Sequence, residues 1–103
     1  TLLTDERAAL RTCVGFSDQR DRLSCAAGMF SLVLEYGQTT RAIAYCHIIE
    51  NSEERRECYR MLFHKYSSLL RSIDEGIDLC PEDDSLCKEG GELAKKDTVR
   101  EFY

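Results

Sequence analysis

The cysteine pattern limits the possible folds of this chain more than any other feature. The chain has six cysteines in 103 residues, namely Cys13, Cys25, Cys46, Cys58, Cys80 and Cys87. The first two are 12 positions apart, and the next two repeat that spacing 33 residues later. An even number of cysteines at this density is typical of a disulfide framework formed in an oxidising compartment. The sequence therefore predicts a secreted protein with three disulfide bonds.

An internal repeat extends beyond the cysteines. A shift of 33 residues superposes Cys13 on Cys46, Asp18 on Asn51, Asp21 on Glu54, Arg22 on Arg55, Cys25 on Cys58 and Phe30 on Phe63. The matched positions are cysteines, helix caps, first-turn acids and apolar core residues, which is what a duplicated helix-turn-helix would leave. The repeat predicts two hairpins over residues 7–37 and 40–70. Because the last cysteine comes five residues early, we expect a third unit to be truncated.

Apolar residues recur at helical spacing in four segments, about residues 4–14, 18–36, 40–49 and 51–73. Gly37 is expected to end the second of these helices. Asn51 is expected to cap the fourth, with Glu54 at the capping-box spacing. The fourth helix is predicted to end between Ile73 and Ile77. Together these helices predict an all-α domain spanning residues 1–103, with four to five helices in two stacked, disulfide-stapled hairpins.

The last thirty residues, 74–103, have a different character. The stretch between Cys80 and Cys87 is predicted to be a short acidic loop, and Gly90-Gly91 is expected to break the chain again. Residues 92–103 are predicted to form a last short helix.

The disulfide pairing follows from helix geometry. On one continuous helix, Cys46 and Cys58 would be ~18 Å apart, too far for a bridge. A turn near Asn51 would bring their Cα atoms within ~6 Å. We therefore expect the pairs Cys13–Cys25, Cys46–Cys58 and Cys80–Cys87. The crossed arrangement of Cys13–Cys58 with Cys25–Cys46 remains open at this point.

Charge and hydropathy narrow the class of partner. The net charge is −5 and no basic cluster is present, which argues against nucleic acid and anionic membrane surfaces. No apolar run reaches the length of a membrane span. The sequence begins at Thr1 without an apolar leader, so a signal peptide is either removed or not included in it.

No residue pattern predicts catalysis or a cofactor. His47 and His64 lack zinc-ligand spacing to the cysteines, and the adjacency of His47 to Cys46 does not make a thiol nucleophile on a helix. The acids from Asp74 to Asp84 fit no register of a calcium-binding EF-hand loop. We therefore expect no catalytic residues, no metal and no cofactor.

The leading functional hypothesis is a secreted, non-enzymatic protein-recognition domain, such as a hormone-, pheromone-, toxin- or effector-like ligand. The alternative is an extracellular carrier of a small apolar ligand or lipid, with the wide apolar face of residues 23–34 lining a pocket. The acidic end of the chain predicts a protein partner that carries basic residues. The predicted contact surface comprises Glu82, Asp83, Asp84, Val99, Phe102 and Tyr103. A competing structural interpretation is that Phe102 only caps the helical stack.

Overall fold

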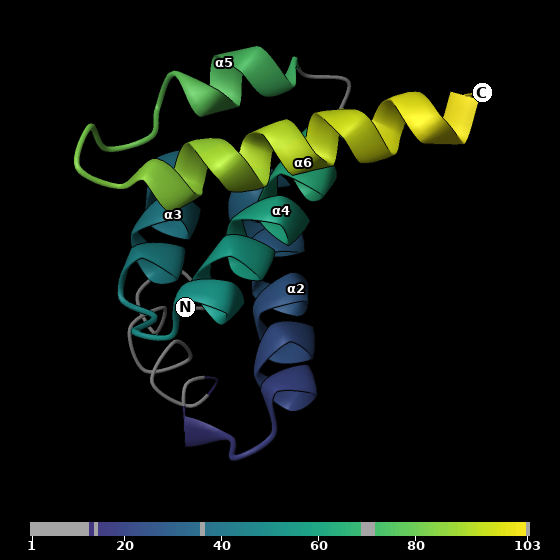
Figure 1. The fold of residues 1–103 in the computed structure, drawn as a ribbon. Helices are drawn as coiled ribbons and strands as arrows, with labels where there is room; N and C mark the ends of the chain where they lie inside the picture. Colours follow the sequence, from purple (N-terminus) through teal and green to yellow (C-terminus); the bar gives the residue numbers. More distant parts are fainter. Residues whose placement is uncertain (1–12, 14, 36, 69–71, 103) are drawn as a thin grey trace.

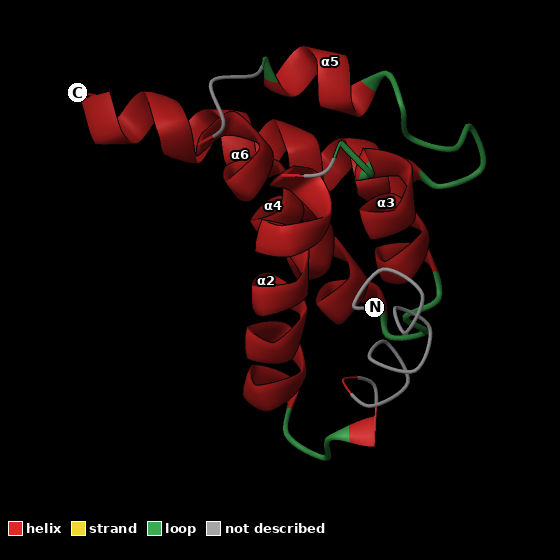
Figure 2. Cartoon of the chain, turned by 180° about the vertical axis from the view of Figure 1, so that it is seen from behind, coloured by secondary structure: helices red, strands yellow, loops and turns green. Residues whose placement is uncertain are grey.

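The computed structural model of the chain describes residues 13, 15–35, 37–68 and 72–102, without the side chains of 32 and 98–102. Within this part the chain is all-α and contains no strand, as predicted. The helices are α2 (Gln19–Glu35), α3 (Thr39–His47), α4 (Ser52–Ser68), α5 (Ile73–Ile77) and α6 (Ser85–Phe102) (Figure 1). Figure 2 shows the same helices from behind.

The helices form two groups that meet on α4. Helices α2, α3 and α4 pack against one another, while α6 lies across α4 and carries α5 on its outer side (Figure 1). The core sits between them and is rich in aromatic side chains from α2, α3 and α4. Its largest fully buried side chains are Tyr45, Tyr59, Phe30, Phe63, Leu34 and Leu62. The rings of Phe30 and Tyr45 meet edge to face with centroids 5.8 Å apart.

Short polar side chains begin two of the helices. The Glu54 backbone N–H donates to Asn51 Oδ1 at 2.9 Å, which confirms Asn51 as the cap of α4. The Arg20 N–H donates to Asp18 Oδ1 at 2.8 Å at the start of α2. Helix α2 ends as predicted before Gly37, whose φ of 73° is in the left-handed region that favours glycine.

Three disulfide bonds join the expected pairs, and the crossed arrangement is absent from the structure. They are Cys13–Cys25, Cys46–Cys58 and Cys80–Cys87, with Cα–Cα distances of 5.5, 5.6 and 5.8 Å. Cys46 and Cys58 link the end of α3 to the first turns of α4. Each disulfide is therefore local to one turn of the chain.

The last thirty residues differ from the prediction. Helix α6 begins at Ser85 and runs through Gly90-Gly91, so the expected break is wrong. A Cβ added at Gly90 would lie 2.5 Å from Tyr59 Cβ and 3.0 Å from the Arg56 carbonyl oxygen. The missing side chain thus lets α6 approach α4 closely, and this packing offsets the low helix propensity of glycine.

A third hairpin follows from this difference. Within the described residues α4 covers Ser52–Ser68. Ser72 is extended, with a ψ of 130°, so the predicted helix is interrupted before Ile73, and Ile73–Ile77 form the separate short helix α5. Helices α5 and α6 are joined across the Cys80–Cys87 disulfide, as α3 and α4 are across Cys46–Cys58. The chain therefore contains a third disulfide-closed hairpin with a shortened first arm.

Candidate functional site: the turn edge

The three disulfide-closed turns lie along one side of the molecule. In Figures 1 and 2 they follow one another from the start of α2, through the α3–α4 connection, to the loop before α6. We call this surface the turn edge and define it as residues 16–21, 48–53 and 79–83. Of the contact residues predicted from the sequence, the turn edge contains only Glu82 and Asp83.

Each connection of the turn edge exposes one large apolar side chain. The side chains are Phe16, Ile48 and Leu79, which are 42%, 57% and 44% exposed. They are the exposed large hydrophobic residues of the described part of the chain. Single exposed apolar residues are common on protein surfaces. What marks this edge is that each of the three connections exposes one such side chain, although at a different distance from the first cysteine of its hairpin.

Exposed acids accompany each of these apolar side chains. Every connection carries two, and together they are Asp18, Asp21, Glu50, Glu53, Glu82 and Asp83. Arg20 is the one exposed base within the same residues. The turn edge is thus strongly acidic around its three apolar positions.

Arg22 forms hydrogen bonds that join the first connection to the second. Its Nη1 donates to the Phe16 carbonyl oxygen at 2.6 Å, and its Nε donates to Glu54 Oε1 at 2.8 Å. The Arg22 side chain is 24% exposed and that of Glu54 only 8%. The hydrogen bond to Glu54 is the main reason that the pKa of Arg22 is raised. A hydrogen-bonded ion pair thus fixes the two connections side by side.

Arg55 ties the second connection to the third in the same way. Its Nε donates to the Ile49 carbonyl oxygen at 2.7 Å, and its Nη1 lies 3.8 Å from Asp84 Oδ1. Arg55 and Ile49 are the positions that the 33-residue repeat superposes on Arg22 and Phe16. The same arginine contact therefore occurs in both repeat units, and it sets the order of the three connections.

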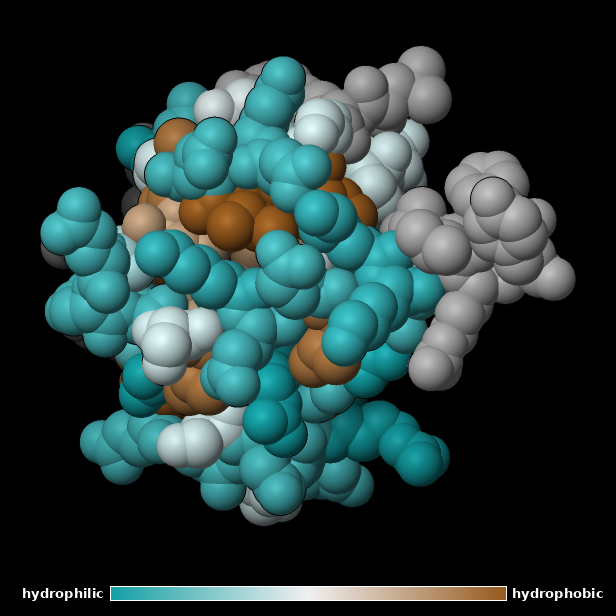
Figure 3. Space-filling view, turned by 45° about the horizontal axis from the view of Figure 1, so that its top comes forward, coloured by the Kyte–Doolittle hydropathy of each residue, from teal (hydrophilic) through white to brown (hydrophobic). Residues whose placement is uncertain are grey.

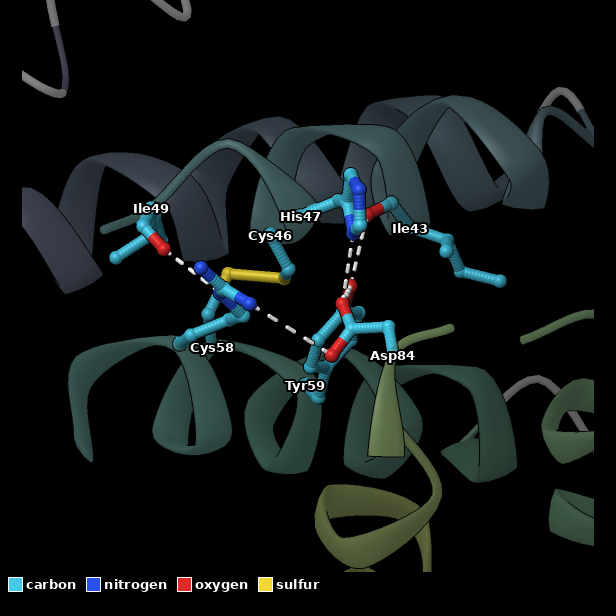
Figure 4. Close-up of a disulfide and its surroundings, with 8 residues drawn as sticks. Ile43, Cys46, His47, Ile49, Cys58, Tyr59 and Asp84 are labelled. Carbon is cyan, nitrogen blue, oxygen red and sulfur yellow. Dashed lines mark hydrogen bonds and ion pairs between the residues drawn. A yellow bond between two sulfur atoms is a disulfide. The ribbon is translucent and has the colours of Figure 1, made fainter. Parts of the chain in front are cut away.

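Asp84 is the centre of the third connection. Its Oδ2 accepts the Tyr59 hydroxyl at 2.5 Å and lies 2.8 Å from His47 Nδ1. Figure 4 shows Asp84 between these side chains, beside the Cys46–Cys58 disulfide. The Asp84 side chain is 1% exposed, whereas that of His47 is 43% exposed. The carboxylate thus joins α3 and α4 to the start of α6.

The surroundings of Asp84 keep it ionised. Burial opposes its ionisation, but the hydrogen bonds with Tyr59 and His47 and the charge of Arg55 outweigh burial. The pKa of Asp84 is therefore lowered. Burial, and then the hydrogen bond to Asp84, raises the pKa of the Tyr59 hydroxyl. The cluster is a charged carboxylate held by a neutral phenol, an imidazole and a guanidinium.

A second acid holds the other part of α6. Asp97 accepts two hydrogen bonds from Arg60, at 2.6 Å from Nε and 2.8 Å from Nη2, and lies 3.1 Å from His64 Nε2. The hydrogen bond from Arg60, followed by that of His64, lowers the pKa of Asp97 to about 2. This pair connects α4 to α6 away from the turn edge.

The contact surface predicted from the sequence is not one compact patch. Asp84 is buried, because its carboxylate is turned inward to Tyr59 and His47, so its predicted place in a contact surface is wrong. Glu82 and Asp83 are exposed. They precede α6, whereas Val99 lies within that helix, about 21 Å along its axis from the first residue, Ser85. The side chains of Val99 and Phe102, and all of Tyr103, lie outside the described residues.

Other predicted features are placed by the structure as follows. On the apolar face of α2, Ala26, Phe30, Val33 and Leu34 are buried in the core.

Within the described residues, no group of three or more His, Cys, Asp or Glu side chains could hold a metal ion. No described helix is long and apolar enough to cross a membrane. Figure 3 shows one face of the molecule, where a band of hydrophobic surface and a few smaller hydrophobic areas lie among polar side chains.

The fold and the turn edge define a class of protein: an all-α domain built from disulfide-closed helical hairpins. Comparisons with protein-family models, with curated proteins and with solved structures found no match to this chain.

Proposed function

We propose that this protein is a secreted, non-enzymatic protein-recognition domain that contacts its partner through the turn edge. The observation that carries the proposal is the repeated exposure of a large apolar side chain among acids at Phe16, Ile48 and Leu79. Protein interfaces are built in this way, with a few apolar anchors surrounded by polar residues that exclude water.

The stiffness of the turn edge also supports recognition. Each connection is closed by a disulfide, and Arg22 and Arg55 fix neighbouring connections to one another. A surface that is already ordered loses little conformational entropy when a partner binds. The anchors are therefore presented at fixed positions before binding.

The Asp84 cluster supports a non-enzymatic role. An aspartate beside a histidine is a common catalytic arrangement, but Asp84 Oδ2 already accepts the Tyr59 hydroxyl inside the protein. The carboxylate side chain is 1% exposed, so substrate would not reach it. The geometry favours a structural role, which is to hold the third connection against the second.

Three disulfides are compatible with an extracellular protein. Counting free thiols in protein from its natural source tests this part of the proposal. We expect no thiols to react under denaturing conditions before reduction and all six after it. A native protein with six free thiols would contradict secretion.

Site-specific photocrosslinking tests the recognition role. A photoreactive phenylalanine analogue replaces Ile48, and the protein is applied to extracellular fluid and cells of its source. Ser68 is the matched control, because it is also exposed and lies at the far end of α4, about 24 Å from the second connection. We expect a discrete protein adduct from position 48 and none from position 68. Equal labelling from positions 48 and 68, or no adduct from position 48, would contradict the proposal.

A further inference from the structure

We infer that the turn edge binds a protein segment that presents basic and apolar side chains together, such as a cationic amphipathic helix. This inference rests on the proposed function and adds the chemistry of the partner. It is argued from the continuity, the charge and the shape of the edge.

The three connections form one continuous surface. Arg22 contacts both the Phe16 carbonyl and Glu54 at the start of α4, which places the first connection against the second. Arg55 contacts the Ile49 carbonyl and approaches Asp84, which places the second connection against the third. A single elongated segment of a partner can therefore lie along all three.

The free charge of this surface is almost entirely negative. Arg22 and Arg55 lie next to the edge, but they form ion pairs with Glu54 and Asp84 and add little free positive charge. Six exposed acids then face solvent together with one exposed base, Arg20. A segment rich in lysine and arginine is the complement of this surface, whereas an acidic segment would be repelled.

A groove at the second connection, bordered by Arg22 of α2, supplies the apolar contact. It is lined by Arg22, Ile48, Ile49, Glu50, Asn51 and Glu54. Arg22 and Glu54, which form an ion pair, line one part of the groove. The side chains of Ile48 and Glu50 are exposed, so a ligand in the groove can contact both. A partner side chain that packs on Ile48 would thus bring a neighbouring base close to Glu50.

A defined peptide tests the inference directly. The probe is a fluorescein-labelled helix of lysine and leucine, about 14 residues or four turns long, with its leucines on one face. Two comparison peptides of the same length replace lysine by glutamate or leucine by serine. Fluorescence anisotropy with the intact, oxidised protein measures binding. We expect the lysine–leucine peptide to bind at least about ten-fold more tightly than either comparison peptide.

Variants of the protein locate the binding site. Ile48→Ser is expected to weaken binding of the lysine–leucine peptide about five-fold through lost apolar contact. Glu50→Lys is expected to weaken it about three- to ten-fold in about 20 mM NaCl, and less in about 500 mM NaCl because salt screens the charges. Glu35→Lys is the matched control, because Glu35 is an exposed acid at the other end of α2 and should leave binding within about two-fold. Far-UV circular dichroism checks that each variant remains folded.

Two results would overturn the inference. Equal binding of the lysine–serine peptide would show that the apolar positions are not recognised. An equal loss with Glu35→Lys and Glu50→Lys would show that attraction is spread over the whole molecule. If either result occurs while position 48 still crosslinks to a discrete protein, the partner chemistry is wrong and the recognition function stands. If crosslinking also fails, the recognition function itself is contradicted.

Discussion

The second hairpin joins α3, of nine residues, to α4, of 17, whereas the third joins α5, of only five residues, to α6, of 18. In the second hairpin both arms are long enough to pack along each other, and Tyr45 and Tyr59 are buried on α3 and α4. In the third, α5 spans little more than one turn. Most of the contact of α6 is therefore with α4 of the preceding hairpin.

The acid at the start of each second arm differs accordingly. Glu54 at the start of α4 pairs with Arg22. Asp84 before α6 approaches the equivalent Arg55, but it is more deeply buried and also contacts Tyr59 and His47. Where the first arm is short, additional polar contacts hold the hairpin in place. The comparison suggests that the third hairpin depends on its neighbour more than the second does.

Removing the aromatic contact between these hairpins should have the largest effect. The Phe63 ring lies close to both Gly76 of α5 and Gly91 of α6. We expect Phe63→Ala to destabilise the protein by about 3–5 kcal/mol, because a large buried side chain is lost. Urea unfolding measures the loss. Hydrogen exchange should show α6 opening more than α2, and the reverse for Phe30→Ala. A loss below about 1 kcal/mol would mean that Phe63 does not anchor the third hairpin.

Neutralising Asp84 should destabilise the protein more than neutralising Glu54. Asp84→Asn is expected to destabilise the protein by about 2–3 kcal/mol, because buried donors lose a charged acceptor. Glu54→Gln is expected to cost about 1 kcal/mol, since Arg22 can turn to water. Equilibrium unfolding of both variants under identical conditions checks the difference. Equal losses would show that the extra contacts of Asp84 contribute no stability.

Adding one methyl group tests the close approach of α6 to α4. Gly90→Ala is expected to destabilise the protein by about 1–3 kcal/mol, because the new Cβ would meet Tyr59 Cβ and the Arg60 backbone nitrogen. Gly28→Ala in α2 is the control, with no atom within 4 Å of the new Cβ. It should stabilise the protein by about 0.5–1 kcal/mol through helix propensity. A neutral Gly90→Ala would contradict tight packing at this crossing.

The pH dependence of stability gives the smallest expected effect. Asp97 has a pKa of about 2 in the folded protein, below its unfolded value. Its contribution is therefore complete above pH ~4 and is lost as the pH falls towards ~2. Because Asp97 is partly exposed, we expect the contribution to be under about 1 kcal/mol. Unfolding free energy measured from pH ~2 to ~6 should fall less steeply for Asp97→Asn than for the native chain. Identical slopes would show that Asp97 is not the titrating group.

Local patterns in the sequence predict several features of the described residues well. The cap at Asn51, the stop at Gly37 and the three cysteine pairs all follow from spacing or turn chemistry, and the structure confirms them. The continuous helix α6 could not be predicted in this way, because Gly90-Gly91 disfavours helix locally. The glycines become favourable only because other helices pack closely on them, with Tyr59 against Gly90 and Ile77 against Gly91.

The inward position of Asp84 could not be predicted from local sequence patterns either. Asp84 stands in a run of acids that is typical of a solvated loop, and its partners His47 and Tyr59 are 37 and 25 residues away in the chain. No local pattern shows which acid of the run turns inward. The turn edge did leave a sequence signal. Phe16 and Ile48 lie close to the caps Asp18 and Asn51, outside the apolar stripes of the helices, and acids follow each of them in the sequence.

The order of the disulfides has a consequence for synthesis. The pairs are sequential, and no bond connects one hairpin to another. A chain that emerges from its amino end therefore presents Cys13 with Cys25 before Cys46 appears, and each later pair is complete before the next begins. Oxidation can proceed vectorially, with at most one native partner available to each new thiol. Each native bond of such a chain can therefore form before the next pair of cysteines is present to compete for it.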